Sequence, residues 1–154
     1  MTATTTLRST PFGGLQPARG TLGMRANTKI EKGWLVGLDA NGRAIVGGTI
    51  ASGCLFGMGI ASSTVDNLTG SAAGGLDDSI DLEIEYGIFG FLSAGGGDAI
   101  ASDDVGKVAY VLDNQTVALT SNSAARGPAG IIHEVRDGLV WVQMGPATRN
   151  LTVA

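Results

Sequence analysis

The chain has 154 residues, the usual size of a single domain and enough to bury a core without disulfide staples. Glycine supplies 25 residues, and Lys and Glu are few, a balance that favours turns and short strands over helices. The single cysteine, Cys54, excludes a disulfide within the chain and any paired-cysteine metal or redox centre, and its apolar neighbours predict a small buried side chain rather than a reactive thiol.

The charge is divided unevenly along the chain. Residues 1–30 hold four basic residues and no acid, whereas residues 31–154 hold 6 basic and 14 acidic residues. A basic segment on an acidic body indicates contact with something negative: a protein surface, a neighbouring subunit or, with the weakest support, nucleic acid. No apolar run approaches the ~20 residues of a membrane span and the N-terminus lacks the apolar centre of a secretory signal, so we expect a soluble protein made in the cytoplasm.

Residues 1–27 are expected to form an extended N-terminal arm. The segment is rich in Thr, Gly, Pro and Arg, and its apolar residues are isolated, so it cannot bury enough surface to fold alone. The apolar and basic side chains that we expect to contact a partner or another subunit are Arg8, Phe12, Leu15, Arg19, Leu22 and Arg25. The alternative interpretation is a disordered tail without a role.

A β-rich domain is expected over residues 28–145, beginning with a hairpin. The apolar run 34–38 is followed by an Asn-Gly pair at 41–42, which supplies the positive φ angles of a tight turn. Residues 55–61 predict a buried strand with glycines where another backbone comes close. Residues 62–79 form a long loop of small residues, and loops of this length usually serve binding, so it is a candidate contact surface.

Residues 80–92 hold the clearest strand signal of the chain. Apolar side chains at positions 80, 82, 84 and 86 alternate with Asp81, Glu83 and Glu85, so one face is apolar and the other carries three carboxylates. The next run is apolar throughout and broken only by two glycines, which is typical of a strand covered on both sides or bent at a glycine. We predict a half-buried strand that continues into the core.

The C-terminal half is expected to hold one helical turn and four strands. Ser102 or Asp103 can cap the turn, and Gly106 can end it in the left-handed conformation. An Asp-Gly pair at 137–138 joins the last two strands in a tight hairpin. The expected segments are strands 107–112, 116–120, 131–135 and 139–144, the loop 121–129 and the tail 146–154. With about eight short strands and no crossover helix, the sequence predicts an all-β fold, a small antiparallel barrel or sandwich whose closure hides its edges.

The convergent polar groups that an enzyme needs are scarce. His133 is the only histidine, lies in an apolar run beside Glu134, and is expected to be a hydrogen-bonded structural residue rather than a general base. The acids near residue 80 lack the glycine and the final glutamate of an EF-hand loop, and no glycine-rich stretch has the Lys-Ser/Thr of a phosphate-binding loop. We therefore predict no enzymatic activity, no cofactor and no metal site.

Three stretches of strand and turn signatures stand out when they are taken together. They are Ile30-Glu-Lys-Gly-Trp-Leu-Val-Gly-Leu-Asp-Ala-Asn-Gly-Arg-Ala, Asp98-Ala-Ile-Ala-Ser-Asp-Asp-Val-Gly-Lys-Val-Ala-Tyr-Val-Leu-Asp-Asn-Gln-Thr-Val, and Ala129-Gly-Ile-Ile through Gly138-Leu-Val-Trp-Val-Gln. In this order they resemble the head decoration, or capsid cement, proteins of tailed bacteriophages. The resemblance implies a β-tulip-like fold, a homotrimer next to other decoration subunits, and binding to the outer capsid surface that clamps neighbouring major capsid proteins together.

If the resemblance holds, the arm residues contact the major capsid protein or an adjacent decoration subunit, and the protein is part of the virion, with no membrane partner and no direct contact to nucleic acid. The rival is a receptor- or glycan-binding β-module displayed on the virion, with loop 62–79 or 121–129 as its receptor surface. Trp34 and Trp141 could stack on sugar rings if exposed, but both lie in apolar runs and are expected in the core or a subunit interface.

Overall fold

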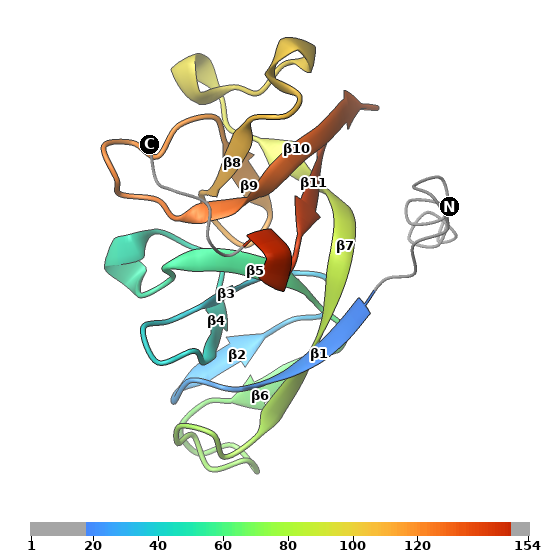
Figure 1. Cartoon of the computed structure of the whole chain (residues 1–154). Coiled ribbons are helices and arrows are strands. Elements are labelled where there is room, and N and C mark those ends of the chain that lie inside the picture. The colour runs from blue at the N-terminus through green and yellow to red at the C-terminus, as the bar shows by residue number, and fades with distance from the viewer. Residues whose placement is uncertain (1–17, 149–154) are drawn as a thin grey trace.

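The computed structural model describes residues 18–148, and this part of the chain has an all-β fold with a small closed barrel, which confirms the predicted class (Figure 1). The strands are β1 (Ala18–Gly23), β2 (Thr28–Ile30), β3 (Leu35–Leu38), β4 (Ala44–Val46), β5 (Phe56–Ala61), β6 (Val65–Asn67), β7 (Asp81–Ser93), β8 (Val108–Val111), β9 (Thr116–Ala118), β10 (Pro128–Arg136) and β11 (Leu139–Met144). The described residues thus hold eleven strands rather than about eight. The excess comes from short pieces such as β2 and β6, whose pairing joins segments far apart in sequence.

Strand β7 runs through both halves of the molecule and curves along its length (Figure 1). Its first half alternates as predicted, with Leu82 and Ile84 fully buried and Glu83 exposed. Gly87, near the middle, has a φ of 149°, a conformation that glycine adopts readily and other residues rarely do. Beyond it, Phe89 and Phe91 are both buried, as expected for a strand that enters the core.

The C-terminal half of β7 belongs to a closed barrel formed with β8, β9, β10 and β11. The ring closes because β11 pairs with β7 over 87–91 and β9 pairs with β7 in parallel at its far end. All the other strand pairs of the ring are antiparallel. Its core consists mainly of aliphatic and aromatic side chains from every strand of the ring, and β3 and β5 supply part of its lining.

The N-terminal half of β7 belongs to a second layer, which we call the flanking sheet, in the order β1-β7-β5-β3-β4. A separate core fills it, with Met24, Ile30, Leu82 and Ile84 all at 0% exposure. Strands β2 and β6 form a two-stranded ribbon that packs against the same core. Just after β1, Met24 forms a parallel bridge to Ala44 of β4, so the sheet curls toward closure at that point.

The two predicted tight turns differ. Asp137 and Gly138 have φ angles of 57° and 76° and join β10 to β11 directly, as the Asp-Gly pair predicts. Between β3 and β4, only Gly42 of the Asn-Gly pair has a positive φ, so that prediction is wrong for Asn41. The Asp39 carboxylate accepts hydrogen bonds from the backbone N–H groups of Asn41 and Arg43, and this widens the connection to a longer loop.

Four short 3-10 turns complete the described chain: η1 (Ile50–Ser52), η2 (Gly96–Asp98), η3 (Ser102–Asp104) and η4 (Pro146–Thr148). The turn η3 is the one predicted, and Gly106 after it has the expected left-handed φ of 92°. Its capping differs from the prediction, because neither Ser102 nor Asp103 supplies the cap. The Asp104 carboxylate instead accepts the N–H of Ala101 at 2.9 Å.

Candidate functional site

The six side chains predicted to contact a partner fall into two groups of three. Arg8, Phe12 and Leu15 lie outside the described residues. Arg19, Leu22 and Arg25 lie in β1 or directly after it, in the folded body. The prediction of an arm that reaches residue 27 is therefore wrong for residues 18–27, which form strand β1 and part of the core behind it.

Two glycines of β1 leave room for side chains of neighbouring segments. A Cβ at Gly20 would meet the end of the Tyr86 side chain, and one at Gly23 would meet the Asp78 carboxylate, so a larger residue at either position would have to displace that side chain. Leu22 packs against the core of the flanking sheet and Met24 is fully buried. A segment that looks too polar to fold alone is thus held by a partner strand distant in sequence.

The outward face of the β1–β7 pair carries an acidic row, Asp81, Glu83 and Glu85, which comes from the alternation of β7. Arg19 pairs with Glu83, with 3.0 Å between Nη1 and Oε1, and both side chains are at least half exposed. In register, Arg19 faces Glu85 across the pair, and Thr21 faces Glu83. One basic side chain against three carboxylates leaves this face with a net negative charge.

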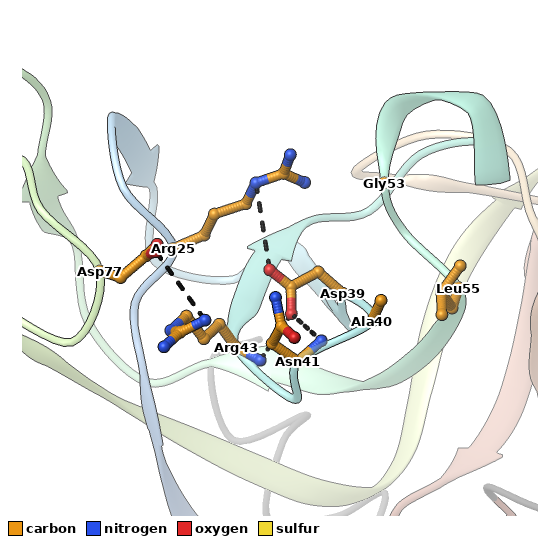
Figure 2. A pocket seen from close by; sticks show the side chains of 8 residues that line it. All are labelled: Arg25, Asp39, Ala40, Asn41, Arg43, Gly53, Leu55 and Asp77. Atoms are coloured by element: carbon orange, nitrogen blue, oxygen red, sulfur yellow. Dashed lines mark hydrogen bonds and ion pairs between the residues drawn. The ribbon is translucent and has the colours of Figure 1, made fainter.

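A polar cleft of about 310 Å³ lies between the β3–β4 loop, the residues after β1 and the end of loop 62–79 (Figure 2). Asp39 is 9% exposed and lies 4.0 Å from Nε of Arg25. Arg43 Nη1 lies 3.8 Å from Asp77, and its Nε and Nη2 donate to Asp78 at 3.1 and 2.9 Å. The hydrogen bond to Asp78 raises the pKa of the Arg43 guanidinium above its ordinary value.

The groups of this cleft neutralise one another. Each arginine faces a carboxylate, and the Asp39 carboxylate already accepts two backbone hydrogen bonds. Such an arrangement holds the β3–β4 loop against the loop before β7. Sequence reasoning missed the role of Asp39, although its place two residues before Asn-Gly is a common signal for a side chain that bonds the turn backbone.

The prediction of a loop over residues 62–79 is wrong for residues 65–67, which form β6 and pair with β2. The rest of this segment, predicted to be a contact surface and still called loop 62–79 here, is organised by one buried amide. Asn67 is 0% exposed, and its Nδ2 donates to the carbonyl oxygens of Arg25 and Leu76 at 3.1 and 2.9 Å. Its Oδ1 accepts from Gly75 N and Ser79 Oγ. Leu68 and Leu76 are left 40% and 69% exposed, the kind of apolar surface that can be buried in a contact.

The predicted loop 121–129 borders a groove of about 810 Å³ between the start of β8 and residues 119–123. The loop prediction is wrong for residues 128–129, because β10 begins at Pro128. Three successive residues of the loop, Asn122, Ser123 and Ala124, have left-handed φ angles between 51° and 67°. The loop is tied to the barrel by Arg126, which is 9% exposed, donates to the Thr120 carbonyl and lies 3.2 Å from Asp98. The Thr120 hydroxyl also donates to Asp98, and these bonds lower the pKa of the Asp98 carboxyl below its ordinary value.

The residues considered for chemistry or for sugar binding differ in their burial. Cys54 is 0% exposed, as predicted, and burial raises the pKa of its thiol, which keeps it in the unreactive protonated form. His133 lies at the irregularity in the register between β10 and β11. Trp141 is 6% exposed and its Nε1 donates to the Arg136 carbonyl, while Trp34 is partly buried against the flanking-sheet core.

Among residues 18–148, no group of three or more His, Cys, Asp or Glu side chains has an arrangement that could hold a metal ion. Within the same residues, no helix is long and apolar enough to span a membrane. A scan against protein-family models and searches of the curated proteins and of the solved structures each give no match to this chain.

Proposed function

We propose that this chain is a structural virion protein that binds the outer surface of a phage capsid and cements neighbouring major capsid proteins together. The observation that carries the proposal is the junction at β1. An acid-free segment of 17 residues leads directly into a six-residue edge strand on an acidic face. Extended segments and strand edges are the elements that make long, flat contacts between proteins.

The described surface also supports a contact role. Its exposed large apolar side chains, Leu68, Leu76, Leu92 and Val105, lie in loops or at a strand end and can be buried by a partner. The arginine and aspartate side chains of the polar cleft form ion pairs with one another. The three stretches that carry the resemblance include the β3–β4 hairpin, η3 with β8 and β9, and the β10–β11 hairpin.

The proposal is tested by measuring the mass of the purified chain by light scattering and then its co-sedimentation with undecorated capsid shells. We expect an oligomer that pellets with shells and saturates at a fixed ratio, because repeated weak contacts gain effective concentration on a shell. Removal of residues 1–17 leaves β1 in place and is expected to abolish pelleting while the circular dichroism spectrum of the body is retained. A full-length chain that does not bind shells would refute the proposal.

A second candidate is a receptor- or glycan-binding module on the virion. The groove beside loop 121–129 favours it, because left-handed non-glycine residues cost about 1–2 kcal/mol each and tend to occur where a loop has a function. The buried Trp141 is not available for stacking on a sugar ring. A glycan array separates the two candidates, since only this second function predicts saturable carbohydrate binding that is lost on deletion of residues 122–124.

A further inference from the structure

Strand β1 differs from the other edge strands of the described chain. It has six residues in continuous register with β7 and no bulge, and β7 is its only partner among the described strands. The edge strands β2, β4 and β6 have three residues each. Long, regular edges are normally shortened, bulged or covered, because their free N–H and C=O groups pair with any available strand.

The direction of the free groups follows from the hydrogen bonds that flank β1. Met24 N donates to the Ile80 carbonyl, so the backbone N–H and C=O groups of Met24 and of the even-numbered residues of β1 point toward β7. The odd-numbered residues, Arg19, Thr21 and Gly23, direct their N–H and C=O groups to the other edge. Arg25 continues that edge and donates to the Ala44 carbonyl, so β4 covers it only beyond Gly23.

The surroundings of this edge indicate what kind of strand would pair with it. On the outward face, the acidic row of β7 has only Arg19 as a basic neighbour, which favours a basic strand. On the core face, Leu22 and Tyr86 are only partly buried, which favours an apolar side chain. The occupant should therefore alternate a basic and an apolar residue and contain no acid.

A segment of this kind precedes β1 in the chain. Residues 2–10, Thr-Ala-Thr-Thr-Thr-Leu-Arg-Ser-Thr, have no acid, glycine or proline and are rich in β-branched threonine. In a strand, Leu7 and Arg8 point to opposite faces, as the edge requires. At about 3.3 Å per residue, nine residues span ~30 Å, enough to cover all of β1.

We propose that the open edge of β1 is a docking site for residues 2–10 of a second copy of this chain, which add to the flanking sheet as one more strand. Because proline biases the residue before it toward an extended backbone, Pro17 directly before β1 favours a donor segment that reaches another copy over one that turns back onto its own strand. Each copy then carries one donor segment and one acceptor edge, a head-to-tail contact that forms a ring when the rotation between copies closes. This inference deepens the self-association part of the proposed function.

Two variants of the full chain test the docking. Thr21→Pro removes an N–H from the open edge without removing a bond to β7, and proline is tolerated on such an edge; Thr21→Val is its matched control. Deletion of residues 2–10 removes the donor and leaves the acceptor edge. By light scattering we expect wild type and Thr21→Val to be oligomers and both test variants to be monomers.

A mixture of the two variants gives the sharpest result. The Thr21→Pro chain still has a donor segment and the deleted chain still has an acceptor edge, so we expect a one-to-one complex from two monomers. Monomers throughout the mixture, or variants that keep the wild-type mass, would overturn the inference. If residues 2–10 pair with β1 of their own chain instead, the mixture should contain only monomers.

A peptide of residues 2–10 provides a measurement that does not depend on how Thr21→Pro folds. We expect saturable binding to the chain that lacks residues 2–10, and binding weaker by roughly twofold to fivefold for the Arg8→Glu peptide at low salt. No binding of the unmodified peptide would also overturn the inference. Shell co-sedimentation separates the two proposals. If the wild-type chain is an oligomer but does not pellet with shells, only the capsid function is refuted. If the chain pellets with shells but Thr21→Pro does not change its mass, only the docking is refuted.

Discussion

The closed barrel and the flanking sheet share β7 but differ in whether the edges of their strands are paired. In the barrel, β11 and β9 both return to the second half of β7, so every strand has two neighbours. In the flanking sheet, the first half of β7 pairs with β1, whose other edge has no partner strand among the described residues. The comparison teaches that one long strand can take part both in a closed barrel and in a sheet that has an edge.

The two regions also differ in what holds them. The barrel core is apolar, and the charged groups that tie its loop 121–129 in place are partly buried. The flanking sheet has a smaller apolar core and depends more on hydrogen bonds and ion pairs, chiefly those of the buried Asn67 and the arginine–aspartate pairs of the cleft. Substitutions in each region should therefore have different sizes and different dependence on pH and salt.

The largest effect is expected in the barrel core. Ile132 is 1% exposed, and Ile132→Ala should lower the free energy of unfolding by about 4 kcal/mol, because it removes buried methyl groups and leaves a cavity. Urea denaturation followed by fluorescence measures the loss. The neighbouring Ile131 is only partly buried, and Ile131→Ala should cost less than half as much; equal losses would contradict the placement of the barrel core.

The next effect is expected at the buried amide of the flanking sheet. Asn67→Ala removes four hydrogen bonds and leaves the Arg25 carbonyl and the Gly75 N–H without their Asn67 partner, at a cost of about 3 kcal/mol. Hydrogen exchange should show loop 62–79 losing protection before the barrel does. Asn41→Ala, at an exposed position, is the control and should change stability little. An equal loss of protection in both regions would mean that the Asn67 hydrogen bonds do not stabilise the flanking sheet independently of the barrel.

A smaller, pH-dependent effect is expected where loop 121–129 meets the barrel. The Asp98 pKa is lowered in the folded state by hydrogen bonds from Thr120 and Arg126, so the folded chain binds this proton less readily than the unfolded chain does. The stabilisation is present above the ordinary aspartate pKa of about 3.9 and is lost as the pH falls through the lower folded value. Asp98→Asn should therefore destabilise the chain at pH 7 and progressively less below pH 4. A deficit that is the same at pH 7 and pH 2.5 would contradict this origin.

The smallest effect is expected at the exposed pair on the flanking sheet. Arg19 and Glu83 are 60% and 50% exposed, so Arg19→Ala should change the free energy of unfolding by less than about 1 kcal/mol, with a difference that fades in high salt. Thermal unfolding at low and high salt measures this. A loss of several kcal/mol would mean that the pair supports the sheet itself and not only its surface charge.

Much of the local structure could be predicted because its signals are local. The alternation around Leu82 and Ile84 sets the two faces of β7, and Asp137-Gly138 is one of the few residue pairs that readily adopt the two positive φ angles of this turn. The burial of Cys54 follows from its apolar neighbours. For the candidate site, the sequence indicated a basic N-terminal segment and a contact loop, but it did not indicate which residues the folded body would hold.

What only the tertiary structure decided is the pairing between segments far apart in the chain. Residues 18–23 read as part of a polar arm, yet they pair with β7, some sixty residues away. The role of Asn67 likewise depends on carbonyl groups of Arg25 and Leu76 that come together only in the fold. The sequence by itself determined the all-β class, the faces of β7 and the last turn, since backbone geometry and side-chain period act within a few residues. The closed barrel and the open edge of β1 depend on which strands meet, and that is selected by packing across the whole molecule.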